Sequence, residues 1–328
     1  MFRYYFKDQT PFMKLLLKKT AYILLFIFIF FNIVCAVQAY HFTRFVDNAP
    51  RQNPAEMGLF IKVGAVLFGT PVPKSKVVDS LHIPHSTVKI ITEDGLQLAA
   101  WSTLHNNAVA AKGTIIMFHG HGSCRSGLTK EAEAFYGLGW NILTVDFRDH
   151  GESEGTTCSV GYNEAKDVKA AYDYAVANGA KNIVLYGISM GAATITKAMH
   201  DYSAIQPKKI ILEMPFGTMH DAAEGFVRVM NLPDEPLGTF LAFWGGTDLG
   251  IWAFSNKPVE YVKDIHCKTL LQWGQEDFRV TQEETNTIYN NLGTKEKKLV
   301  VYANSGHQSL CKNEHDKWMQ NITTFLNE

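Results

Sequence analysis

The sequence has little net charge, few charged residues and few cysteines. Its 31 Lys and Arg against 32 Asp and Glu leave a formal charge of −1, so no overall basic field attracts nucleic acid, and neither nucleic acid nor an acidic partner is expected. Charged residues make up 19% and hydrophobic residues 46%, which excludes a mostly disordered chain. Only five cysteines are present, but a chain of 328 residues can bury a large core without disulfides or metals.

A long apolar run lies near the N-terminus, from Ala21 to Val37, interrupted by Asn32. Its length lies between that of a signal-peptide core and that of a membrane-spanning helix. Val37-Gln38-Ala39 favours cleavage after Ala39, whereas the long segment before the run and its aromatic content favour an uncleaved anchor. The run is preceded by basic residues, so the positive-inside rule predicts that the rest of the chain is exported, as a membrane-anchored or secreted protein on the periplasmic or extracytoplasmic side. These basic residues are Arg3, Lys7, Lys14, Lys18 and Lys19.

We expect three segments: a signal peptide or membrane anchor at 1–40, a helix and linker at 41–85, and the main domain at 86–328. Within the second segment, Pro54–Phe68 is predicted to be a helix too short to span a bilayer. It either packs against the main domain or lies in the membrane interface. Pro71 and Pro73 then mark the linker.

The cysteines are compatible with export. Cys35 lies in the apolar run, and the other four allow three pairings. Among these, Cys124 and Cys158 both follow predicted strands on the same side of the expected sheet. A bridge between them and two free thiols are both open alternatives.

Apolar strands alternate with helices in the main domain, which predicts a mostly parallel sheet covered on both faces. The expected strands are Thr87–Thr92, Leu96–Trp101, Thr114–Phe118, Asn141–Asp146, Ile183–Tyr186, Lys209–Leu212, Thr269–Trp273 and Leu299–Tyr302. The first two flank Glu93-Asp94-Gly95, a hairpin signal. Functional sites in such sheets lie at the carboxyl ends of the strands.

Two pentapeptides match the pattern G-x-S-x-G, one centred on Ser153 and one on Ser189. A nucleophilic serine of this kind needs a sharp turn between a strand and a helix. Ser189 fits, because a predicted strand precedes it and a plausible helix, Ala192–His200, follows it. No helix begins directly after Ser153, so we expect a structural turn there.

A serine hydroxyl needs a base, and the base needs an orienting acid. His307 follows the last predicted strand and is the expected base. Asp277 follows the preceding strand and is the expected acid, with Glu276 and Glu213 as alternatives.

The oxyanion of an acyl-transfer reaction needs two aimed N–H donors. We expect the backbone N–H of Met190, the residue after the nucleophile, and that of His121 in the glycine-containing loop His119-Gly120-His121-Gly122. His119 and His121 also look like metal ligands, but no third ligand matches them, so no metal is expected. Cys124 lacks a base at a suitable spacing to be a rival nucleophile.

These motifs resemble the α/β-hydrolase superfamily, from about Thr87 to Phe325. The resemblance also covers Asp146–Ser153, a structural loop in that family, although Asp149 stands here where relatives usually carry glycine. It implies an α/β-hydrolase fold, with a mostly parallel central sheet, helices on both faces and a small helical cap, about 216–262, inserted between strands 6 and 7. The insertion is rich in aromatic residues, which weakly favours a lipophilic substrate.

The resulting hypothesis is an exported or membrane-tethered serine hydrolase that cleaves small-molecule or lipid-like carboxylic esters through an acyl-enzyme. Such a reaction needs no cofactor. The alternatives on the same triad are a peptidase, a thioesterase or an acyltransferase. An alternative of another class is a non-catalytic, membrane-anchored binding protein on a hydrolase fold.

Overall fold

The computed structural model describes residues 11–49, 58–69, 71–105 and 110–328. An eight-stranded sheet forms its centre, in the order β10-β9-β8-β7-β5-β6-β4-β3. The pairs β3–β4 and β4–β6 are antiparallel and all others are parallel. The strands are β3 (Ser86–Ile91), β4 (Gln97–Thr103), β5 (Thr114–Phe118), β6 (Asn141–Val145), β7 (Ile183–Ile188), β8 (Lys209–Glu213), β9 (Lys268–Gly274) and β10 (Lys297–Tyr302).

The central strands are apolar on both faces because helices cover both. Every residue of β5 is buried, as a continuous apolar run predicts for a strand inside a parallel sheet. At the antiparallel edge, β3 and β4 are joined at the expected hairpin, where Gly95 has a φ of +85°.

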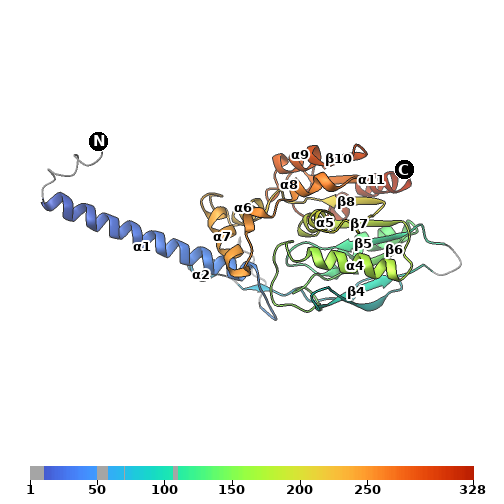
Figure 1. Ribbon diagram of the computed structural model, residues 1–328, viewed down its shortest axis with the longest axis horizontal. Coiled ribbons are helices and arrows are strands. Elements are labelled where there is room, and N and C mark those ends of the chain that lie inside the picture. Colours follow the sequence, from blue (N-terminus) through green and yellow to red (C-terminus); the bar gives the residue numbers. More distant parts are fainter. Residues whose placement is uncertain (1–10, 50–57, 70, 106–109) are drawn as a thin grey trace.

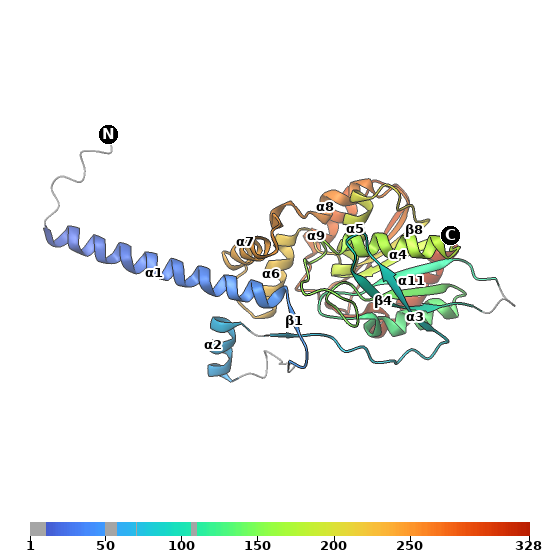
Figure 2. The same cartoon turned by 60° about the horizontal axis from the view of Figure 1, so that its bottom comes forward.

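Two helical layers enclose the sheet (Figures 1 and 2). In one layer α4 contacts α5, and in the other Phe135 of α3 contacts Trp318 of α11, with ring centroids 5.3 Å apart. The bounds are α3 (Thr129–Gly137), preceded by the 3₁₀ turn η1 (Arg125–Leu128), α4 (Ala165–Ala177), α5 (Met190–Asp201), α9 (Gln282–Asn291), α10 (Leu310–Asn313) and α11 (His315–Asn327).

A helical insertion separates β8 from β9, the sixth and seventh strands of the main sheet, which confirms the predicted architecture. It comprises α6 (Met219–Val229), α7 (Leu237–Leu249), η2 (Ala253–Ser255), α8 (Pro258–Tyr261) and η3 (Val262–Asp264). Thr218 caps α6, because its Oγ1 accepts a hydrogen bond from the backbone N–H of Asp221.

The N-terminal region holds one long helix and one short one. Helix α1 runs from Pro11 to Phe42, 32 residues, and it is long and apolar enough to cross a membrane. Figure 1 shows it projecting away from the sheet. Helix α2 (Leu59–Phe68) lies beside α1 (Figure 2), and the Gln38 side-chain amide donates to the Ala65 carbonyl at 2.7 Å.

The last turns of α1 pack on the cap. Buried Cys35 and Ala39 of α1 form one apolar cluster with Val227 of α6 and Leu241 of α7. At its edge, the Trp244 indole donates to the Asn32 side-chain oxygen at 3.1 Å. Several cap aromatics, among them Phe226, Phe240 and Trp244, thus contact the N-terminal helix, a partner that their pattern in the sequence did not reveal.

The structure adds detail to the segments predicted before the main domain. The apolar helix is longer than the run Ala21–Val37, since it extends from Pro11 to Phe42. The expected linker contains a parallel strand pair, β1 (Phe45–Val46) with β2 (Val72–Pro73). The predicted helix Pro54–Phe68 is described only from Leu59, because 50–57 lie outside the described residues.

The suggested Cys124–Cys158 bridge is not formed. Both cysteines are buried free thiols. The Cys124 thiol lies 3.6 Å from the Lys76 carbonyl oxygen, and the Cys158 sulfur lies 3.6 Å from the Met190 sulfur. Burial raises the pKa of both thiols, so Cys124 is also a poor candidate for a nucleophile.

Candidate active site

Ser189 occupies a sharp turn between β7 and α5. Its φ of +54° and ψ of −116° lie where a residue with a side chain rarely sits, which costs about 1–3 kcal/mol. The glycines on either side permit this turn. A Cβ on Gly191 would lie 2.3 Å from the Phe118 carbonyl oxygen, and one on Gly187 would lie 2.6 Å from the Ala192 nitrogen.

His307 and Asp277 meet Ser189 from two other loops at the same sheet edge. His307 Nε2 lies 2.8 Å from Ser189 Oγ, and His307 Nδ1 lies 2.7 Å from Asp277 Oδ2. His307 comes from the β10–α10 loop and Asp277 from the β9–α9 loop. The structure therefore brings the three sequence-predicted residues into one hydrogen-bonded series.

The Asp277 side chain is fixed in place and fully buried. Its Oδ1 accepts hydrogen bonds from the backbone N–H groups of Arg279 at 2.8 Å and Val280 at 3.0 Å, so Oδ2 is left for the histidine. The two alternative acids lie elsewhere. Glu276 is exposed, and Oε1 of buried Glu213 accepts from the Gln272 amide and the Trp318 indole.

Two backbone N–H groups lie beside Ser189. Met190 is the first residue of α5, where an N–H has no acceptor within its own helix. The loop after β5 passes close by, since a Cβ on Gly120 would lie 3.4 Å from Ser189 Cβ. Within the described part of the chain, the next N–H of that loop, that of His121, has no hydrogen-bond partner. One expected oxyanion donor thus directly follows Ser189 in the chain, and the other directly follows Gly120, which lies close to that serine.

Three histidines support this loop through their rings. His150 Nε2 accepts from the Gly122 N–H at 3.2 Å, and His119 Nε2 accepts from the Phe147 N–H at 3.1 Å. His121 Nε2 donates to the Phe42 carbonyl at 2.9 Å. Burial lowers the pKa of all three, that of His121 to about 4. Because these nitrogens already bond to backbone groups, His119 and His121 do not form a ready metal site.

Another three-residue cluster lies on α6, outside the triad. His220, Asp221 and Glu224 offer ligand atoms within 4.8 Å of one another. His220 Nε2, however, already lies 2.9 Å from Glu235 and 3.0 Å from Thr239 Oγ1. We therefore read this cluster as an ion-paired helix face.

The second G-x-S-x-G stretch is structural. Ser153 is buried, and its hydroxyl donates to the Asp146 carbonyl at 2.7 Å and accepts from the Ala99 N–H at 2.9 Å. No base lies among these partners. Ser153 thus ties the loop after β6 to strand β4.

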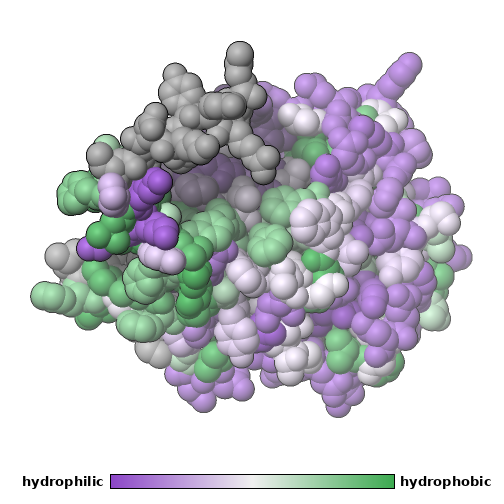
Figure 3. All heavy atoms as spheres, turned by 60° about the vertical axis from the view of Figure 1, so that its left-hand side comes forward, coloured by the Kyte–Doolittle hydropathy of each residue, from purple (hydrophilic) through white to green (hydrophobic). Residues whose placement is uncertain are grey.

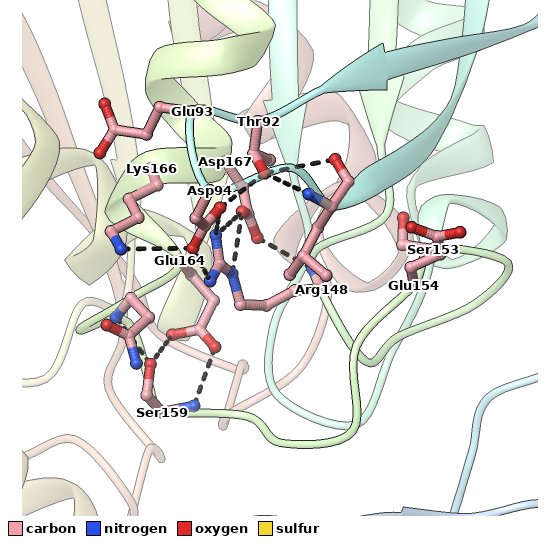
Figure 4. A network of polar contacts seen from close by, with 12 residues as sticks. Thr92, Glu93, Asp94, Arg148, Ser153, Glu154, Ser159, Glu164, Lys166 and Asp167 are labelled. Carbon is pink, nitrogen blue, oxygen red and sulfur yellow. Dashed lines mark hydrogen bonds and ion pairs between the residues drawn. The ribbon is translucent and has the colours of Figure 1, made fainter. Parts of the chain in front are cut away.

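An ion-pair network around buried Arg148, which sequence reasoning missed, anchors the same loop (Figure 4). Arg148 Nε donates to Asp167 at 2.9 Å, and its Nη1 donates to Asp94 at 2.9 Å. Burial acts to raise the pKa of Asp94, but the hydrogen bonds from Arg148 and Thr92 lower it well below its usual range. Arg148 lies 54 positions from Asp94, a separation that no local pattern signals.

Comparison with known proteins agrees with this geometry. The family model described as serine aminopeptidase, S33, matches residues 109–241, which include Ser189 and the loop after β5. The esterase Pf2001 of Pyrococcus furiosus superimposes with a TM-score of 0.65 over 78% of this chain and 97% of that one, at 24% identity. The chain has the α/β-hydrolase fold.

Curated relatives of this α/β-hydrolase are distant. YqkD of Bacillus subtilis, an uncharacterized protein, is 27% identical over 65% of this chain and 70% of its own length. Lysophosphatidylserine lipase ABHD12 of Mus musculus is 23% identical over 60% of this chain. The match spans 54% of that lipase, about half of its length.

Proposed function

We propose that this α/β-hydrolase is a serine esterase that cleaves carboxylic esters of membrane lipids through an acyl-enzyme. Ser189 Oγ attacks the ester carbonyl while His307 Nε2 takes its proton. Asp277 holds the ring so that Nε2 faces the serine, and it stabilises the imidazolium that forms. The backbone N–H groups of Met190 and His121 receive the oxyanion. His307 then protonates the leaving alcohol, and water releases the acid by the same steps.

The hydrogen-bonded series of Ser189, His307 and Asp277 carries the proposal. Its two distances, 2.8 Å and 2.7 Å, are short enough for proton transfer and orientation without rearrangement. The strained backbone of Ser189 adds support, because such strain persists where surrounding structure imposes it and is concentrated at active sites.

The choice of lipid esters rests on the surroundings of the triad. The cap between β8 and β9 carries aromatic side chains, and it packs on a helix apolar enough to enter a bilayer. In Figure 3, hydrophobic residues gather on the left of the view and hydrophilic residues cover the right. Similar proteins point the same way, since they include an esterase and a lysophosphatidylserine lipase. We propose that α1 anchors the enzyme, with the catalytic domain on the exported side.

The test uses the full chain in detergent, labelled with a fluorophosphonate and digested for mass spectrometry. We expect the label on Ser189 alone, together with turnover of a nitrophenyl butyrate. Ser189→Ala loses both. A folded wild-type protein that neither labels nor turns over would instead favour the non-catalytic binding protein.

The family model's description favours one second candidate, a serine aminopeptidase. The same triad serves both reactions, so substrate panels must separate them. Aminoacyl nitroanilides, thioesters and esters of one acyl length are compared by kcat/KM. Turnover of the anilides above that of the esters would establish the peptidase.

A further inference from the structure

The loop that carries His307 is bonded to a glutamate at each of its ends. At its start, Glu314 Oε1 accepts a hydrogen bond from the Ser305 hydroxyl at 2.7 Å. At its other end, the Ser309 hydroxyl donates to Oε1 of Glu131. Glu314 belongs to the same stretch of chain as the loop, whereas Glu131 lies 178 positions from Ser309. The second contact therefore ties the loop to a distant part of the domain.

The Ser309 hydroxyl has a defined direction. Its oxygen accepts the backbone N–H of Lys312 at 3.1 Å and so caps α10. The hydroxyl proton is thereby left for Glu131. Because Ser309 lies two positions after His307, this contact fixes the point at which the loop turns into α10.

Glu131 is a costly residue to place where it stands. It lies in the first turn of α3 and is completely buried, with 0% of its surface exposed. Among the described residues, Ser309 bonds to Oε1, and Oε2 has no hydrogen-bond partner. A buried polar group costs free energy unless it is hydrogen-bonded. The contact with Ser309 is thus what a carboxyl adds here that an apolar side chain would not.

Helix α3 is continuous with the loop that carries an expected oxyanion donor. Residues 122–124 lead from His121 into the turn η1, and η1 leads directly into α3. The turn is itself fixed, since the backbone N–H of Arg125 donates to a carboxylate of the loop after β6 at 2.6 Å. The contact between Glu131 and Ser309 therefore joins the segment after His121 to the segment after His307.

We propose that Glu131 is a positioning residue of the esterase, which acts through Ser309 to hold His307 in place relative to Ser189 and the loop after β5. This inference rests on the proposed esterase function. Proton transfer requires His307 Nε2 to stay within hydrogen-bond distance of Ser189 Oγ, which lies 2.8 Å away. When the contact is lost the loop shifts, so kcat falls while KM changes little.

The test uses the full chain in detergent with nitrophenyl butyrate as substrate. Reactive serines are counted with a fluorophosphonate, so that kcat is expressed per active site. Glu131→Leu removes the acceptor at similar volume, and Ser309→Ala removes the donor. Each should lower kcat by about tenfold and leave KM within about twofold. The double variant should lose no more than either single variant, because both substitutions break the same contact.

Two further variants separate positioning from a role in stability alone. Glu131→Gln keeps an acceptor oxygen for Ser309 and should retain kcat within about threefold. Burial raises the pKa of the Glu131 carboxyl and so favours its neutral form, which an amide resembles. Glu133→Leu is the matched control on the same helix. It removes the acceptor of the His82 N–H, at 3.0 Å, and should leave kcat unchanged.

Denaturant unfolding of the same samples completes the test. If Glu131→Leu and Ser309→Ala are less stable but keep kcat per reactive serine, the contact only stabilises the fold and the inference is wrong. It is also wrong if Glu131→Gln loses as much kcat as Glu131→Leu. Ser309→Ala decides the question if Glu131→Leu does not fold. A wild type that neither turns over nor reacts with the probe would instead overturn the esterase proposal, and the inference with it.

Discussion

The turns around Ser153 and Ser189 share the pattern G-x-S-x-G but differ in almost every physical respect. Ser153 is buried, and its hydroxyl has a donor and an acceptor among backbone groups of β4 and the loop after β6. Ser189 is half-buried, has a positive φ, and its hydroxyl lies against an imidazole. A serine that already bonds to backbone holds a loop, whereas one held in strain beside a base is ready to react.

The motif therefore specifies a tight turn, and the groups around the serine decide whether the serine reacts or holds a loop in place. Both pentapeptides need glycine for close approach. Gly155 has a φ of +117°, and a Cβ there would lie 2.8 Å from the Asp149 nitrogen. A Cβ on Gly191 would likewise collide with the Phe118 carbonyl oxygen. Only the second turn begins a helix and faces the loops of Asp277 and His307.

The largest expected effect comes from replacing each of the two serines by alanine in separate variants. Ser189→Ala should lower ester kcat by about 10⁴-fold or more, because it removes the hydroxyl that His307 Nε2 faces. Ser153→Ala should keep most activity but lower the free energy of unfolding by about 1–3 kcal/mol, since it leaves buried backbone groups unpaired. Kinetics and denaturant unfolding measure both. Equal activity losses in the two variants would contradict the assignment.

Removing the orienting acid comes next. Asp277→Asn should lower kcat by about 10³–10⁴-fold, because the amide no longer stabilises the imidazolium or fixes its tautomer. Glu276→Gln is the control, since that neighbour is exposed. Comparable losses in both variants would mean that the acid is not Asp277.

A smaller change strains the catalytic turn alone. Gly191→Ala places a Cβ 2.3 Å from the Phe118 carbonyl oxygen, so the turn must shift. A displacement of about 1 Å at the nucleophile can cost about 10²-fold in kcat. Gly137→Ala, where a Cβ meets nothing within 4 Å, should leave kcat unchanged. Steady-state kinetics on nitrophenyl butyrate measure both variants. Full kcat in Gly191→Ala would mean that the turn tolerates the added methyl group.

The last expected effect is a pH dependence of stability that comes from His121, in the loop after β5. Burial lowers the pKa of His121 from 6.5 to about 4, so below pH 6.5 the unfolded chain binds more protons than the folded one. The free energy of unfolding should therefore fall by roughly 2–3 kcal/mol as the pH drops from 6.5 to about 4. Urea unfolding at several pH values measures it. In His121→Gln the free energy of unfolding should change less with pH. An unchanged pH dependence would mean that other groups cause the effect.

The sequence alone determined the elements that depend on local pattern. Continuous apolar runs predicted the strands, and the strand–G-x-S-x-G–helix order singled out Ser189. Chain order placed His307 and Asp277 after the last two strands, and parallel strands bring such loops to one edge. These predictions needed only periodicity, glycine conformations and the topology of a parallel sheet.

Only the tertiary structure decided where distant segments meet. Phe42 stacks on His121, Arg148 bonds to Asp94 and Asp167, and the cap aromatics rest on α1. Each contact joins residues far apart in the chain through burial and shape, which leave no periodic trace. The apolar run could be read as a signal or an anchor from sequence, because hydropathy measures transfer to lipid and says nothing of what a helix packs against.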